Sequence, residues 1–251
     1  MKLTTILTAC SSVIATAFLA SSCVKETGKE VAMEMTDYSS KSFIQVYNGT
    51  VGAARNQYHV DGARVTGGPQ AYGGTFPATP SLFAVTSGFR AFLVYDTLVT
   101  TTQPPMSFAE NLQMGANYTI FMYDTLNSPK QKIVQNNIII PSDTTSRIRF
   151  ANFIFSKTAV PNVDLFSVKR NANVFTNVNI TEVTNYIPHP SSRNTAQNDT
   201  LYVRETGTMV TLATLTGFAP VQKRSYTLVF RGRYQSTTGT PIRTLSSFSS
   251  N

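Results

Sequence analysis

The chain has 251 residues, of which 41% are hydrophobic and 14% charged, with 14 Gly, 12 Pro and two Cys. This hydrophobic fraction can fill cores, which excludes a wholly disordered chain, and two cysteines exclude a disulfide-dense scaffold or a cysteine-rich zinc module. The net charge of +8 comes from 21 Lys and Arg against 13 Asp and Glu. Because the basic residues do not gather in one segment, we expect no nucleic-acid partner.

Residues 1–22 have the pattern of a lipoprotein signal peptide. Lys2 precedes an uncharged stretch from Leu3 to Leu19, which is shorter and more polar than the ~20 apolar residues of a membrane-spanning helix. The segment ends in Leu19-Ala20-Ser21-Ser22-Cys23. It resembles a bacterial lipobox, in which small residues precede a cysteine that is lipidated and becomes the mature N-terminus. The alternative is an ordinary signal peptide cleaved elsewhere, with Cys23 left as a free thiol.

Lipidation of Cys23 would leave the mature chain without a thiol, because Cys10 departs with the signal peptide. Several acyl chains on one residue hold a protein stably at a bilayer. Val24 is not acidic, so we expect the outer membrane or the cell surface of a diderm bacterium rather than the inner membrane. Residues 23–40 are polar and are predicted to form a flexible tether.

From residue 41 onward the apolar pattern is short and mostly of period two. The runs are rich in β-branched and aromatic residues, they are separated by turn residues, and they fall at 43–47, 89–95, 118–123, 147–150, 163–166, 201–203 and 226–230. This pattern predicts an all-β fold, either a sandwich or a barrel, divided into two tandem domains over residues 41–141 and 146–251.

Two halves of the chain resemble each other. Residues 46–48 match 150–152 at an offset of 104, and residues 118–121 match 226–229 at an offset of 108. Turn residues at 141–145 separate the halves. The last strand of each half is expected at 132–140 and at 241–248.

Residues 147–232 resemble the domain of unknown function 4397 family of exported bacterial proteins. The resemblance is carried by Arg149-Phe150-Ala151-Asn152, by residues 161–166, by Leu201-Tyr202-Val203-Arg204 and by residues 225–229. The usual acidic-Ala-Pro turn is replaced by residues 157–161, and the first half matches only at its ends. The resemblance implies an Ig-like sandwich and a cell-surface role, without an established enzymatic activity.

The side chains that could perform chemistry do not form a recognisable set. His59 and His189 have no second His or Cys at metal-ligand spacing, and both are expected at the surface or in loops. A glycosidase pair would have to come from carboxylates that nothing in the sequence singles out, such as Asp61, Asp96, Asp164 and Glu182. We therefore predict no catalytic residue, metal or cofactor. The glycines at 67–68 and 73–74 predict a mobile hairpin tip.

Four of the seven aspartates are followed by threonine, at Thr97, Thr125, Thr144 and Thr200. The pattern is similar to the Asp-Thr-apolar acceptor of a general O-glycosylation system. The alternative is that each pair begins or ends a strand through side-chain-to-backbone hydrogen bonds.

These features predict a non-enzymatic, lipid-anchored surface protein with a structural or adhesive role, whose partner is the bilayer that holds acylated Cys23. The alternative is a glycan- or protein-binding module that accompanies an outer-membrane uptake system. Tyr58, Tyr72 and Tyr95 are the rings considered for stacking on sugars, and the chain has no Trp. The oligomeric state is left open.

Overall fold

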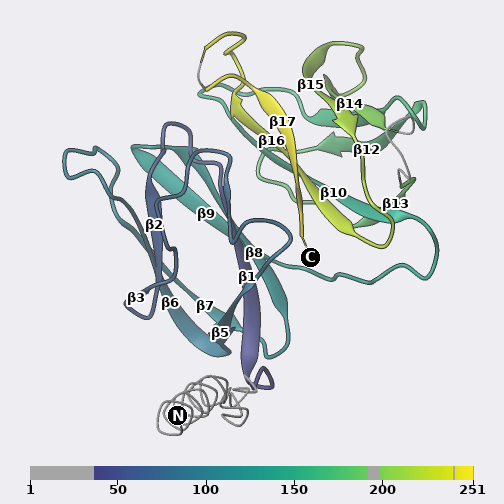
Figure 1. The fold of residues 1–251 in the computed structure, drawn as a ribbon. Helices are drawn as coiled ribbons and strands as arrows, with labels where there is room; N and C mark the ends of the chain where they lie inside the picture. Colours follow the sequence, from purple (N-terminus) through teal and green to yellow (C-terminus); the bar gives the residue numbers. More distant parts are fainter. Residues whose placement is uncertain (1–36, 192–197, 240, 251) are drawn as a thin grey trace, which may run out of the picture. The chain divides into compact units, whose positions relative to one another are not determined.

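The computed structural model describes residues 37–191, 198–239 and 241–250, which form strands and connecting loops without a helix (Figure 1). The all-β prediction is therefore confirmed. In these residues no helix is long and apolar enough to cross a membrane. The strands are β1 (Lys41–Asn48), β2 (Asn56–Val60), β3 (Ala63–Arg64), β4 (Thr75–Phe76), β5 (Phe83–Thr86), β6 (Gly88–Asp96), β7 (Met106–Leu112), β8 (Asn117–Thr125), β9 (Ser128–Gln135), β10 (Ser146–Phe155), β11 (Val163–Ser167), β12 (Ala172–Val178), β13 (Ile187–His189), β14 (Asp199–Glu205), β15 (Thr211–Phe218), β16 (Ser225–Arg233) and β17 (Thr244–Ser249).

The first nine strands form a β-sandwich. One sheet has the order β4-β1-β8-β9, with β5 also paired to β1, and the other has the order β3-β2-β6-β7. Alternate side chains of both sheets point into the space between them, as period-two strands require. The core residues include Ile44, Val46, Tyr58, Phe92 and Ile120.

The last eight strands form a second sandwich in the same arrangement. Its sheets have the orders β13-β10-β16-β17 and β12-β11-β14-β15. Its core contains Ile148, Phe150, Leu165, Val203 and Leu228, each fully buried.

The strand register repeats between the two sandwiches. β1 runs parallel to β8 with Asn48 opposite Met122, and β10 runs parallel to β16 with Asn152 opposite Phe230. These pairs follow the sequence offsets of 104 and 108 between the halves. Equivalent positions in the two sandwiches can therefore be compared one by one.

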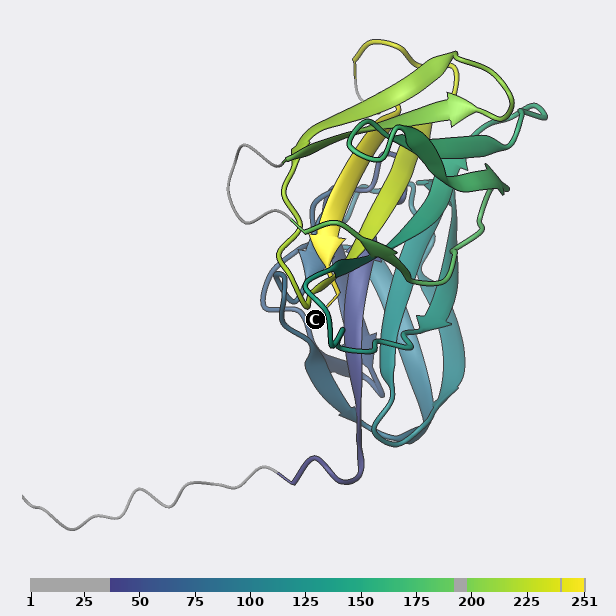
Figure 2. The ribbon, with the colours of Figure 1, turned by 90° about the vertical axis from the view of Figure 1, so that its right-hand side faces the viewer.

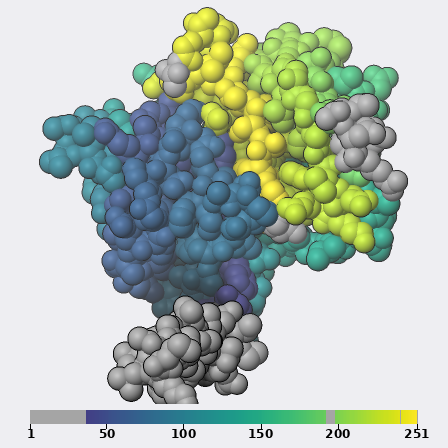
Figure 3. All heavy atoms as spheres, in the orientation of Figure 1, coloured from purple at the N-terminus to yellow at the C-terminus, as the bar shows by residue number. Residues whose placement is uncertain are grey.

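The sandwiches pack against each other through the sheets that contain β1 and β10 (Figures 1 and 2). A third apolar cluster fills this interface and consists of Tyr47, Phe121, Ala151, Phe153, Val229 and Phe248, with Tyr123, Val134 and Val183 packed against it. We call it the interface cluster. The central strands β1, β8, β10 and β16 are thus buried on both faces. Figure 3 shows β17, in yellow, along the seam between the two lobes.

Two local expectations were wrong. The last strand of the first sandwich is Ser128–Gln135 rather than 132–140, because a tight turn at 126–127 lets β9 pair with β8 from Thr125 opposite Ser128. The segment at 67–74 is not a hairpin tip, since it joins strands of different sheets. Its end is held by Gly73 N–H, which donates to the Asn48 carbonyl oxygen.

Candidate functional site

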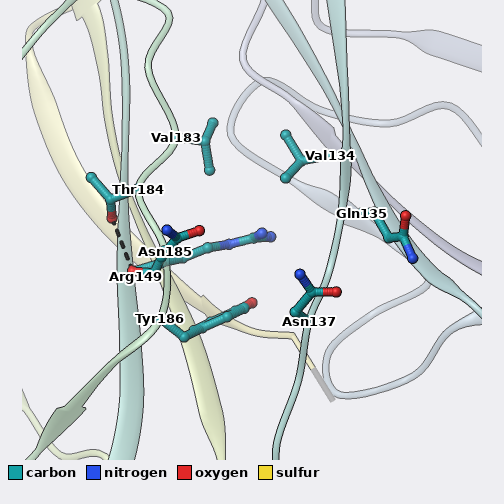
Figure 4. Close-up of a pocket in the computed structure, with 8 residues that line it drawn as sticks. All are labelled: Val134, Gln135, Asn137, Arg149, Val183, Thr184, Asn185 and Tyr186. Atoms are coloured by element: carbon teal, nitrogen blue, oxygen red, sulfur yellow. Dashed lines mark hydrogen bonds between the residues drawn. The ribbon is translucent and has the colours of Figure 1, made fainter.

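A cavity of about 300 Å³ opens at the junction of the two sandwiches. Its lining comes from the end of β9, from the connection between the sandwiches, from β10 and from the loop that follows β12 (Figure 4). The residues are Val134, Gln135, Asn137, Arg149, Val183, Thr184, Asn185 and Tyr186.

Arg149 is the buried charge of this cavity. It lies on β10, on the strand face turned toward the first sandwich, and only 2% of its surface is exposed. Its Nε donates to Thr227 Oγ1 over 2.8 Å and its Nη2 donates to Thr119 Oγ1 over 3.0 Å. The guanidinium therefore hydrogen-bonds to both sandwiches at once.

The Arg149 guanidinium is held by hydroxyls and aromatic rings. Its Cζ atom lies 4.8 Å from the Tyr186 ring centroid and 5.6 Å from that of Phe121, distances at which a ring face attracts a cation. Among the described residues, none of the ion pairs involves Arg149. Burial lowers the pKa of Arg149 below its ordinary value, with the nearby Tyr186 opposing that shift.

Apart from Val134 and Val183, the described residues that line the cavity around this cation are polar, and none of them carries a second charge. Gln135, Asn137 and Asn185 contribute exposed amides, and Tyr186 contributes a half-buried phenol. Figure 4 shows the Arg149 side chain extending across the cavity toward Val134 and Gln135. A guanidinium offered to a space lined by amides can bind an anion and hydrogen-bond the neutral groups that the anion carries.

The residues predicted for modification lie apart from this cavity. Thr97 and Thr144 are exposed, whereas Thr125 and Thr200 are half-buried. Cys23 lies outside the described residues. Neither lipidation nor O-glycosylation is tested by the fold, and both stay predictions.

The aspartates that precede the threonines also bind the backbone. Asp96 Oδ1 accepts from the Leu98 N–H over 2.9 Å, and Asp143 Oδ1 accepts from the Thr145 N–H over 2.9 Å. These are the turn hydrogen bonds of the alternative interpretation. They leave the threonine side chains at positions 97 and 144 exposed to solvent.

The expectation that His189 lies at the surface or in a loop was wrong. His189 is fully buried on β13. Its Nε2 lies 3.2 Å from Asp199 Oδ2, and Ser167 Oγ donates to that same carboxylate oxygen. The order Ser–Asp–His differs from a catalytic triad, in which the histidine contacts the hydroxyl and takes its proton. Burial outweighs the attraction of Asp199 and lowers the pKa of His189 to about 4.

The carboxylates considered for catalysis have structural partners. Asp61 accepts from the Ala91 N–H, Asp164 from the Asn177 N–H, and Glu182 from the Asn179 N–H. Within the described ranges, no group of three or more His, Cys, Asp or Glu side chains could hold a metal ion.

Sequence reasoning missed the Arg149 cavity, although one signal was present. The repeat places Gln45 at the position equivalent to Arg149, and both residues are buried. A charge in only one of two equivalent positions marks a place where the two halves differ. Comparison with known proteins found no family model that matches the chain and no similar curated protein.

Proposed function

We propose that this chain is a lipid-anchored, non-enzymatic protein of the outer membrane or cell surface, with a structural or adhesive role. The observation that carries the proposal is the interface cluster, which joins the two sandwiches into one unit. The lipobox pattern at Cys23 and the polar residues 24–40 support the anchor and the tether. The resemblance of residues 147–232 to the domain of unknown function 4397 family supports the surface role.

The interface has the packing and hydrogen bonds that a spacer of fixed geometry needs. The ring centroids of Phe121 and Phe153 are 4.9 Å apart, and those of Tyr47 and Phe248 are 5.3 Å apart. Arg231 Nε donates to Tyr47 Oη over 2.7 Å. Buried aromatic pairs with a satisfied hydroxyl resist hinge motion, because separating them exposes apolar surface and breaks the hydrogen bond.

A second candidate function is binding of a glycan or a protein. The outer face of the sheet β3-β2-β6-β7 is turned away from the interface and carries Phe89, which is 73% exposed. On the same face His59 and Tyr95 pack with ring centroids 5.2 Å apart. Tyr58 is buried in the core and Tyr72 is half-buried, so Tyr95 is the one of the three candidate tyrosines that supports this function.

Palmitate labelling of the full chain tests the anchor. Wild type should incorporate the label, and Cys23→Ser should lose it, because the thiol is the site of acylation. Cys10→Ser is the matched control and should keep the label, since Cys10 lies within the predicted signal peptide. Labelling that survives Cys23→Ser would contradict the proposal. Protease treatment of intact cells should then degrade the labelled protein if it is exposed at the cell surface.

O-glycosylation is part of this proposal and has its own test. Mass spectrometry of the protein from its native host should find a glycan first at Thr97 and Thr144, whose side chains are exposed. Unmodified Thr97, Thr125, Thr144 and Thr200 would reject the modification and favour the turn interpretation.

A further inference from the structure

We propose that the cavity beside Arg149 binds a small hydroxylated acid through its carboxylate, as in a uronic acid. Nothing in the proposed anchoring or spacer role requires such a site. Failure of one proposal therefore does not imply failure of the other.

The first argument is the unused donor capacity of Arg149. A guanidinium has five N–H donors, and two of them are taken by Thr227 and Thr119. A residue that is 2% exposed and has no carboxylate partner in the described part of the chain bears a desolvation cost that two hydroxyls offset only in part. An anion in the adjoining cavity would supply the missing acceptors.

The second argument comes from the repeat. Gln45 occupies the equivalent position on β1 and lies opposite Thr119, just as Arg149 lies opposite Thr227. The fold therefore accommodates a neutral side chain at this strand position. The charge at Arg149 is not needed to build the sandwich, and the cavity beside it is a reason for it to be there.

The chemistry of the walls selects the kind of anion. Among the described residues that line the cavity, Arg149 is the only charged one. A ligand with a single negative charge therefore balances it, whereas a phosphate dianion would leave one negative charge unbalanced. The planar fork of a guanidinium also matches the geometry of a carboxylate. Gln135, Asn137 and Asn185 can donate to and accept from hydroxyl groups.

The size of the cavity limits the ligand. A volume of about 300 Å³ is at the lower end of the range for small-molecule sites, which is roughly 300–1,000 Å³. It suits one acidic sugar residue, either as a free acid or as the end of a chain. Both sources present the same carboxylate and hydroxyl groups.

Calorimetric titration of the full chain in detergent tests the site, with D-glucuronate as the probe. We expect glucuronate to bind, and glucose, which lacks the carboxylate, to bind at least about tenfold more weakly. A uronate-ended oligosaccharide that binds more tightly than glucuronate identifies a glycan as the source, and equal binding identifies the free acid. Absence of glucuronate binding, or preferential binding of inorganic phosphate, would overturn the proposal.

Arg149→Gln introduces the residue that the first sandwich carries at the equivalent position, and it should weaken glucuronate binding at least about tenfold. Arg64→Gln is the matched control, because it removes the same charge from an exposed position on β3. It should bind like wild type. If Arg149→Gln does not fold, Asn137→Trp fills the cavity mouth from an exposed position and should abolish binding. Unchanged binding in a folded Arg149→Gln or in Asn137→Trp would refute the site.

Discussion

Phe153→Ala tests whether the interface cluster couples the two sandwiches. Phe153 lies on β10, is 2% exposed and belongs to the interface cluster rather than to either sandwich core. Its ring centroid lies 4.9 Å from that of Phe121 and 5.1 Å from that of Tyr123, both in the first sandwich. Removing the ring should therefore weaken the contact between sandwiches while leaving each core intact.

The magnitude follows from the burial of the ring. Truncating a buried Phe to Ala costs about 3–5 kcal/mol through lost transfer free energy and the cavity left behind. In Phe153→Ala the loss of stability cannot exceed the free energy that couples the two sandwiches. The sandwiches can separate from each other instead of staying in contact around the cavity left by the missing ring. We expect the variant to lose most of its coupling, so that two unfolding transitions replace one cooperative transition.

Urea denaturation followed by tyrosine fluorescence and by far-UV circular dichroism measures the change. In the wild type the two probes should coincide, and in Phe153→Ala they should separate. Phe150→Ala is the matched control: it lies on the same strand, but its fully buried side chain belongs to the second core. It should destabilise the second sandwich itself. A single transition with the wild-type midpoint in Phe153→Ala would refute the reasoning.

Two further substitutions test local features of the second sandwich. Burial lowers the pKa of His189 from 6.5 to about 4. As the pH falls from 6.5 to 4, His189 therefore takes up a proton in the unfolded chain but not in the native state, and up to about 3 kcal/mol of stability is lost. When urea unfolding is compared at pH 7.5 and 4.5, His189→Gln should abolish that loss, whereas the control Val178→Ala should retain it. An unchanged pH dependence in His189→Gln would contradict the lowered pKa of His189. Gly232 has a φ of +109° and a Cβ there would collide with the Ile242 carbonyl, so Gly232→Ala should lower stability in thermal unfolding by roughly 1–3 kcal/mol or more. Gly67→Ala, with open space around it, should stay within about 1 kcal/mol of wild type, and equal effects of both would contradict the collision.

The strands and the repeat could be predicted because both depend on local pattern. Alternation of apolar and polar residues identifies a strand with one buried face, as in β14. Similar triplets at residues 46–48 and 150–152 identify equivalent strands before any contact is known. The run at 118–123 also carried information that alternation alone does not give. Its uninterrupted burial in β8 reflects two cores, one on each face of the strand.

The cavity and the buried histidine could not be predicted, because both depend on which surfaces meet. His189 is flanked by prolines, which favour a loop, but it pairs with Ser146 of β10 and is covered by the second core. In an alternating strand, Arg149 would face away from the core of its own sandwich. It is buried only because the first sandwich covers that face.

The differences between equivalent positions explain how two copies of one fold came to fit each other. The first sandwich presents large rings at Tyr47 and Phe121, and the second presents Ala151 and Val229 at the same strand positions. Two large faces would collide and two small faces would leave a void, whereas one of each can pack closely. The halves have thus diverged toward each other, and their contact would not form equally well between two identical copies. Arg149 stands outside this pattern, because its guanidinium hydrogen-bonds to both sandwiches and also borders the cavity for which we propose a carboxylate ligand.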